Sequence, residues 1–248
     1  MGNNTSEIRS SSAMSSVTTS SADPWFNFGG LVGQTAGLIV ESFASSSFEN
    51  TGNIANLGGL VGITGFGATI RRSYAVGDPV APVLLGRADI GGLVGYHDRG
   101  TIEDSFARGF VIETTSPENS LNGLGGLVGR GVPSEDTEIQ RSYAAVAFDL
   151  DPSASASVGG LVGRAPSTEP EDGIPGYDYE VVSSFWDSSI GPDISDGGEP
   201  RTSEQLAQTS FAPAWFETGM PWMMHTPADP GSGPTAFPWL IWAESLAP

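Results

Sequence analysis

Neither cysteine nor lysine occurs in this sequence of 248 residues. The absence of cysteine excludes disulfides, thiolate catalysis and cysteine-ligated metal sites. The ten basic residues are all arginine, and 29 acidic residues bring the formal net charge to −19. Because this charge repels the phosphate groups of nucleic acids and of anionic membranes, we expect neither of these as a partner.

The excess of acidic residues has two interpretations. It is similar to the composition of proteins from salt-loving organisms, in which dissolved salt screens the repulsion between acidic groups. It also fits an acidic extracellular surface in an ordinary medium. The first interpretation predicts that the fold gains stability as the salt concentration rises.

Long apolar stretches and histidine pairs are missing as well. No run reaches the length of about 18 apolar residues that a membrane-spanning helix needs. Residues 1–24 are polar and serine-rich, show no apolar centre of a signal peptide, and are expected to form a flexible tail. His97 and His225 stand alone, and the pair Asp193 and Asp196 lacks the regular spacing of calcium loops. We therefore expect no metal site and no cofactor.

Glycine, in contrast, is abundant, and much of it belongs to one repeated motif. The pentapeptide Gly-Gly-Leu-Val-Gly occurs five times, with successive copies 29, 33, 34 and 34 residues apart. The copies begin at Gly29, Gly58, Gly91, Gly125 and Gly159. A period of this size is typical of a solenoid, in which each repeat stacks on its neighbours.

A second motif, serine followed by an aromatic residue and then alanine or tryptophan, recurs after each pentapeptide. Its serines are Ser42, Ser73, Ser105, Ser142 and Ser184. An aliphatic residue stands three positions before each serine, and short apolar segments alternate with glycine-rich or polar turns. Short strands at a fixed period, without helical periodicity, predict an all-β fold: a right-handed parallel β-helix of about five coils with a C-terminal cap.

The composition divides the chain into three regions. After the tail at residues 1–24, the solenoid occupies residues 25–190, and a tryptophan-rich segment follows at 191–248. We interpret this last segment as a cap that covers the terminal coil, beginning with a short helix from Thr202 or Ser203 to Gln208. An aromatic platform for carbohydrate is the alternative. The acidic, proline-rich insert Pro166 to Asp178 is expected to be an exposed loop.

The residues directly before the second-motif serines are expected to form a column of alternating charge. They are Glu41, Arg72, Asp104, Arg141 and Ser183. In a stack, Arg72 would then lie between two carboxylates and Asp104 between two guanidinium groups. A sugar-cleaving β-helix needs clustered, unpaired carboxylates, so this neutralised column favours a structural role over catalysis.

The aromatic residues of the second motif are expected to form a ladder. They are Phe43, Tyr74, Phe106, Tyr143 and Phe185. Because side chains alternate along a strand and Arg71 and Arg72 indicate a corner, we place the rings on the outer face of the solenoid. A ladder inside the core is the rival interpretation. An outer ladder needs a cover of loops or tails, or else it is a ligand-binding surface.

Taken together, the two motifs resemble the GLUG-motif repeats. The resemblance rests on Gly-Gly-Leu-Val-Gly followed by Ile-x-x-Ser-[Phe/Tyr]-Ala-x-Gly-x-Val and covers residues 28–187, although residues 143–148 lack the glycine. Such repeats recur in large bacterial and archaeal cell-surface and adhesin-like proteins, and near immunoglobulin-A peptidases. The resemblance implies a surface location and a binding role, and it supplies no catalytic residues.

The expected function is therefore non-enzymatic: a repeat module of a secreted or cell-surface protein, used for adhesion or for building an extracellular structure. Its expected partner is a carbohydrate or a protein ligand. Two alternatives stay open. In the first alternative, the chain is a subunit of an extracellular filament, assembled from copies of itself through solenoid ends or through strand donation by the tail. Alternatively, it is a polysaccharide hydrolase or lyase on a β-helix.

Overall fold

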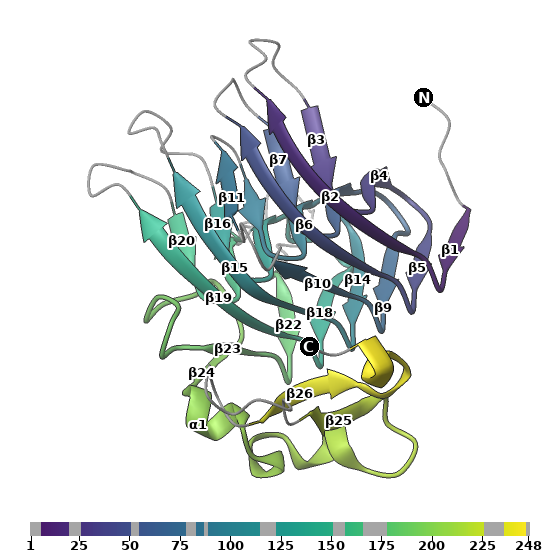
Figure 1. The fold of residues 1–248 in the computed structure, drawn as a ribbon, viewed down its shortest axis with the longest axis vertical. Coiled ribbons are helices and arrows are strands. Elements are labelled where there is room, and N and C mark those ends of the chain that lie inside the picture. The colour runs from purple at the N-terminus through teal and green to yellow at the C-terminus, as the bar shows by residue number, and fades with distance from the viewer. Residues whose placement is uncertain are drawn as a thin grey trace, which may run out of the picture.

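The computed structural model describes residues 6–19, 26–50, 55–77, 83–86, 89–114, 123–150, 157–165, 178–225 and 236–246. Figure 1 shows a stack of strands that begins with the N-terminal strands and ends at the strands next to the C-terminal segment. The insert expected as an exposed loop lies outside the described residues, apart from Asp178, which is exposed.

The chain winds into a parallel β-solenoid, which confirms the predicted fold class. Four sheets run along the stack, and successive coils contribute parallel strands to each of them. The solenoid has about four turns, slightly fewer than the five coils expected. The Leu-Val segments pair as predicted, with Val61 opposite Val32 on one side and Val94 on the other.

Two of the sheets meet at the glycine motif. The strands that end at its first residue form sheet C: β3 (Phe26–Gly29), β7 (Ala55–Gly58), β12 (Ile90–Gly91), β16 (Gly123–Gly125) and β20 (Ser157–Gly159). The strands that begin at its valine form sheet D: β4 (Val32–Thr35), β8 (Val61–Thr64), β13 (Val94–His97), β17 (Val128–Gly131) and β21 (Val162–Arg164). A Cβ atom on Gly58 would lie 1.9 Å from the carbonyl oxygen of Val61. The corner therefore requires glycine.

The other two sheets carry the second motif. The strands with the aliphatic residue form sheet A: β1 (Glu7–Arg9), β5 (Leu38–Val40), β9 (Thr69–Arg71), β14 (Gly100–Glu103), β18 (Thr137–Gln140) and β22 (Glu180–Val182). Sheet B contains the strands that follow the serine, together with β11 and β24. Its strands are β2 (Ser12–Thr19), β6 (Phe43–Asn50), β10 (Tyr74–Gly77), β11 (Val83–Gly86), β15 (Phe106–Thr114), β19 (Tyr143–Leu150), β23 (Phe185–Asp187) and β24 (Glu199–Arg201). Each coil fills its thin core with residues such as Leu93, Ile102 and Ala107, all fully buried.

A serine ladder holds the corner between sheets A and B. At this corner each coil has a non-glycine residue in the left-handed region, with φ between 45° and 49°. The serine after it stabilises the turn: Ser105 Oγ donates to the carbonyl of Glu103 at 2.8 Å and accepts from the N–H of Ser73 at 3.2 Å. The same pair of bonds recurs from coil to coil. This explains why the motif requires serine, which both donates and accepts.

The prediction of a flexible tail at residues 1–24 is wrong for residues 7–19. Strand β1 pairs with β5, and β2 pairs with β6 over eight residues in register. The physical reason is that Ile8 and Ser11 occupy the aliphatic and serine positions of the second motif. Accordingly, the N–H of Ser11 donates to Ser42 Oγ at 3.1 Å, so this segment joins the serine ladder.

The C-terminal segment does more than cap the last coil, so the predicted assignment of residues 191–248 to an end cap needs correction. Residues 188–201, the end cover, do close the stack: Ser195 Oγ accepts from the N–H of Val162 at 2.9 Å, and β24 pairs with β23. The rest, residues 203–225 and 236–246, forms a lateral cover along the side of sheet B, shown in green and yellow in Figure 1.

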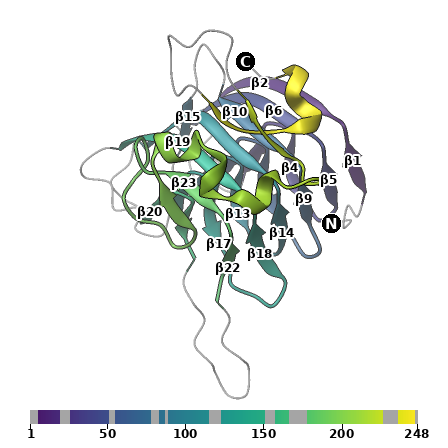
Figure 2. The same ribbon diagram turned by 90° about the horizontal axis from the view of Figure 1, so that it is seen from below.

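Short elements make up the lateral cover. They are α1 (Ser203–Leu206), η1 (Thr209–Phe211), η2 (Pro213–Phe216), the antiparallel pair β25 (Trp222–His225) and β26 (Phe237–Leu240), and η4 (Ile241–Leu246). Thr202 caps α1 in a capping box with Gln205, but this helix ends at Leu206, two residues before the predicted end. Figure 2 shows the lateral cover from below, crossing several coils.

Candidate functional site

The aromatic column stacks on the outer side of sheet B, away from the solenoid core. The ring centroids of Phe43 and Tyr74 are 4.9 Å apart, as are those of Tyr74 and Phe106, and those of Phe106 and Tyr143 are 5.2 Å apart. These distances match the spacing of strands in a sheet. The rings belong to a second apolar cluster, separate from the one that contains the inward-facing alanines.

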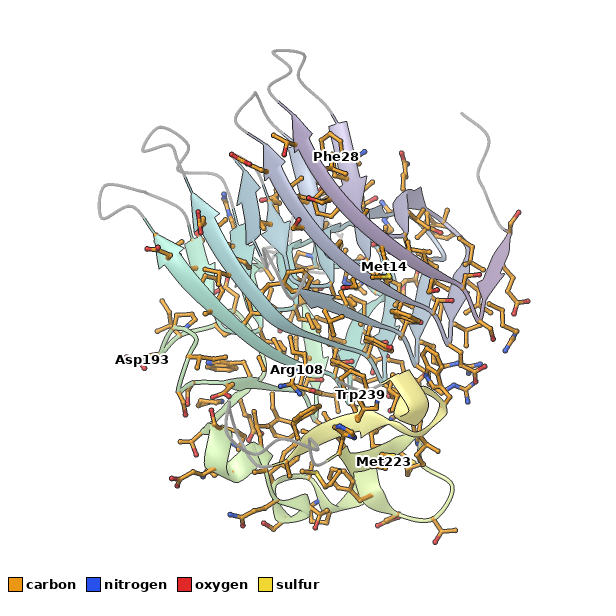
Figure 3. All side chains as sticks on the ribbon, in the orientation of Figure 1. Met14, Phe28, Arg108, Asp193, Met223 and Trp239 are labelled. Carbon is orange, nitrogen blue, oxygen red and sulfur yellow. The ribbon has the colours of Figure 1, made fainter. Side chains whose placement is uncertain are left out.

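The lateral cover buries most of this column. Tyr74, Phe106, Tyr143 and Phe185 are all at most 5% exposed, and Phe43 is half-buried. The covering residues are Trp215, Trp222, Trp239 and Trp242, whose rings contact successive rungs of the ladder. In Figure 3, Trp239 points from the lateral cover toward sheet B. Four of the five rings thus offer no face to a ligand in this structure, and a binding role for the column stays a prediction.

Polar contacts fix the lateral cover to the solenoid. The indole N–H of Trp222 donates to Asp104 at 3.1 Å, and that of Trp242 donates to the carbonyl of Arg72 at 2.9 Å. The guanidinium carbon of Arg108 lies 3.3 Å from the ring centroid of Phe237, in a cation–π contact. The tryptophan-rich segment therefore serves as a structural cover, and the platform alternative has no support from these buried rings.

The expected charge column divides into two separate pairs. Arg72 contacts Glu41 at 2.9 Å, and Arg141 forms a bidentate pair with Asp104, with N–O distances of 2.8 and 3.0 Å. Within the described part of the chain, no ion pair joins Arg72 to Asp104. The reason is that Asp104 is already occupied by Arg141 and by the Trp222 indole. Ser183 is exposed beyond Arg141. The column is neutralised as expected, but it is not continuous.

A different face of the solenoid carries the strongest candidate for a ligand site. On the outer side of sheet A lies an open groove of about 440 Å³. Its walls come from the turn at Phe66 and Gly67, from strands β9, β14, β18 and β22, and from the turn before β18. The side chains that can meet a ligand there are Phe66, Thr69, Thr101, Glu135, Asp136, Glu138 and Glu180.

One column of sheet A supplies the floor of this groove. Thr69, Thr101, Glu138 and Glu180 occupy equivalent positions in four successive coils. The pKa of Glu138 is raised, first because the carboxyl is partly desolvated and then because Glu180 and Glu103 carry like charges. Neighbouring strands are about 4.8 Å apart, so Glu138 and Glu180 are adjacent carboxylates.

Phe66 gives the groove an apolar edge. Its side chain is 64% exposed, and the guanidinium carbon of Arg99 lies 5.7 Å from its ring centroid. An exposed ring beside hydroxyl and carboxylate groups can stack on the C–H face of a sugar while the oxygens accept hydrogen bonds from its hydroxyls. The sequence analysis missed this site, although the signal was present: the residue before the aliphatic position is Thr, Thr, Glu and Glu in coils two to five.

The two histidines lie far apart in the chain and pack against aromatic residues. His97 is fully buried and bonded through Nδ1 to the hydroxyl of Tyr179, and burial lowers its pKa to about 4. His225 packs against Phe237 and Trp239. Asp193 and Asp196 are both exposed, and the Asp196 carboxylate accepts a hydrogen bond from the N–H of Ala165.

Among the described residues, no group of three or more His, Cys, Asp and Glu side chains is arranged to hold a metal ion. A helix long and apolar enough to cross a membrane does not occur in this part of the chain either.

Comparison of the chain with protein-family models, curated proteins and solved structures gave no match. The resemblance to GLUG-motif repeats therefore stays a prediction.

Proposed function

We propose that the chain is a non-catalytic recognition module of a secreted or cell-surface protein, and that it binds a glycan through the groove on sheet A. One observation carries the proposal: the exposed ring of Phe66 lies at the edge of a groove whose floor is a column of threonine and glutamate side chains. The regular spacing of the coils repeats these polar groups at about 4.8 Å along the groove.

The charge of the groove narrows the class of ligand. Glu135, Asp136, Glu138 and Glu180 line the groove, so the charge of its lining is negative. Two arginines lie nearby, with Arg99 against the ring of Phe66 and Arg141 close enough to act on Glu138. Uronic acids and sulfated sugars would be repelled. Neutral glycans can use the carboxylates as hydrogen-bond acceptors, and amino sugars add an attractive charge. The preferred ligand is therefore a neutral or amine-bearing glycan.

A glycan array tests this proposal. The intact chain is expected to bind neutral or amino-sugar glycans, and Phe66→Ala is expected to give a weaker signal for the same glycans. The matched control is Ile194→Ala, because Ile194 is 67% exposed in the end cover, outside the groove. Equal binding by all three proteins, or binding restricted to acidic glycans, would contradict the assignment.

One observation favours a second function, cleavage of the glycan. Hydrolysis by paired carboxylates requires two neighbouring acids, and Glu138, whose pKa is raised by desolvation and by like charges, lies opposite Glu180 in the register of sheet A. Incubation of the chain with the glycans that it binds distinguishes the two functions. A recognition module leaves their length unchanged, whereas shortening that disappears in Glu138→Gln would establish an enzyme.

A further inference from the structure

The N-terminal end of the solenoid is an open sheet edge. Strand β2 pairs with β6 on one side, and among the described residues no strand pairs with its other side. Strands β1, β3 and β4 are likewise the first strands of their sheets. An edge of this kind presents backbone N–H and C=O groups that another strand can bind.

The hydrogen bonds show which residues face this edge. The carbonyl and the N–H of Ser11 both point toward β6, where they bond to Phe43 and to Ser42. Backbone groups alternate in direction along a strand, so those of Ser12, Met14, Ser16 and Thr18 point away from the stack. The open edge therefore offers alternate N–H and C=O groups along the whole length of β2.

Strand β2 of this edge lacks two of the features that usually protect sheet edges. Strand β2 reads Ser-Ala-Met-Ser-Ser-Val-Thr-Thr, without proline and without a charged residue, and Met14 is 82% exposed. In β1, the only two charges are those of Glu7 and Arg9, which pair with each other. In a chain of net charge −19, this edge adds no acidic groups of β2 to the general repulsion between two copies.

The opposite end of the stack differs in both respects. The end cover already occupies the last coil through Ser195 and β24. It also carries Asp193, Asp196 and Glu199. Stacking of one chain on the end of another would therefore bury acidic groups and would have to displace the end cover. Figure 3 shows Met14 and Asp193 on opposite sides of the stack.

From these observations we infer that two copies of this chain associate through their N-terminal edges, with the two β2 strands antiparallel across a twofold axis. A twofold contact uses the same edge on both chains, so it closes after two copies and leaves both end covers in place. The partner is a second copy of this chain, and the product is a dimer in place of a filament.

The mass of the full chain in solution is the first test. Light scattering coupled to size-exclusion chromatography is expected to give twice the 25.7 kDa of one chain at high concentration. The protein concentration at which the dimer dissociates should fall as NaCl rises from about 0.1 M to about 1 M, because salt screens the residual repulsion between the two chains. A monomer from micromolar to millimolar concentration at both salt levels would overturn the inference, and so would masses that keep growing.

Spin labels test the geometry, because the chain has no cysteine of its own. Single cysteines at Ser12, Met14, Ser16 and Thr18 would place one label on each chain. In an antiparallel pair each step of two residues away from the twofold axis adds roughly 14 Å between the labels. Equal distances at all four positions, or a short distance between labels at Met14 and Asp193 in mixed samples, would refute the twofold arrangement.

Two proline variants separate loss of pairing from loss of folding. Met14→Pro removes an N–H that points away from the stack, so the melting temperature of the isolated chain should be kept while the dimer weakens by about tenfold or more. Ala13→Pro removes an N–H on the side of β6 and should lower the melting temperature instead. A Met14→Pro variant that folds and dimerises like the natural sequence would overturn the inference.

Discussion

The serine ladder supports a quantitative prediction about stability, tested by Ser105→Ala. Ser105 is fully buried, and its hydroxyl both donates to the carbonyl of Glu103 and accepts from the N–H of Ser73. Alanine removes the donor bond, which contributes about 0.5–1.5 kcal/mol, and leaves the buried N–H of Ser73 without an acceptor, which costs about 1–3 kcal/mol. We expect the free energy of unfolding to fall by about 2–4 kcal/mol.

Ser11 provides the matched control from the same ladder. Its hydroxyl donates to the carbonyl of Arg9 at 3.0 Å, but it belongs to the first coil described and no N–H of another coil's serine donates to it. Ser11→Ala therefore loses one partly exposed bond and leaves no backbone N–H of the ladder unpaired. We expect a loss of about 1 kcal/mol or less.

Denaturant unfolding of the two variants, combined with amide hydrogen exchange, measures the difference. The amide of Ser73 should exchange faster in Ser105→Ala, while the amides of distant coils keep their protection. If Ser105→Ala were no more destabilising than Ser11→Ala, or if exchange at Ser73 did not change, the ladder would not stabilise the corner in the way described.

Four further predictions concern charge, pH and salt. Arg72→Glu should destabilise the fold by about 1 kcal/mol at low salt, because it turns the 2.9 Å contact with Glu41 into a repulsion, and Glu41→Arg in the same chain should recover most of the loss in unfolding measurements. Burial raises the pKa of Asp89 to about 6, so the fold loses stability as this carboxyl ionises between about pH 4 and 6. In unfolding measurements, Asp89→Asn should therefore raise the free energy of unfolding by up to about 3 kcal/mol at pH 7 and leave it unchanged near pH 3. His97 acts in the opposite sense: its pKa is lowered to about 4, so the stability present above about pH 6.5 is lost as pH falls through 4. In a series of thermal melts at decreasing pH, His97→Gln should lack this fall in melting temperature. A melting temperature that stays flat from low to molar NaCl would remove the argument for a salt-adapted fold at net charge −19.

The repeat spacing was sufficient to predict the solenoid, because a fixed period forces equivalent segments into neighbouring strands. Val32, Val61 and Val94 are opposite one another for this reason. The same logic applies to the N-terminal strands, where Ile8-x-x-Ser11 matches the second motif but has serine in place of the aromatic residue. The serine-rich composition of residues 1–24 concealed this match, and the segment was therefore predicted to be flexible.

The lateral cover and the groove depend on information that the period does not contain. Tyr143 donates to the carbonyl of Pro238, 95 positions along the chain, and no spacing rule predicts such a contact. The same distant packing takes Asp104 out of the expected charge column, since Trp222 binds it from the lateral cover. The groove could be predicted only in part. The repeat places Glu138 beside Glu180, but only the folded turn brings Phe66 into the same groove.

The central claim, recognition of a glycan in the groove on sheet A, is tested most directly by calorimetric titration of three proteins with one glycan identified on the array. Removal of the Phe66 ring should weaken binding by about three- to tenfold, in keeping with the energy of one aromatic stacking contact. Ile194→Ala should bind like the natural sequence. An affinity of Phe66→Ala equal to that of the natural sequence, with the glycan still bound, would place the ligand elsewhere on the solenoid and contradict the account.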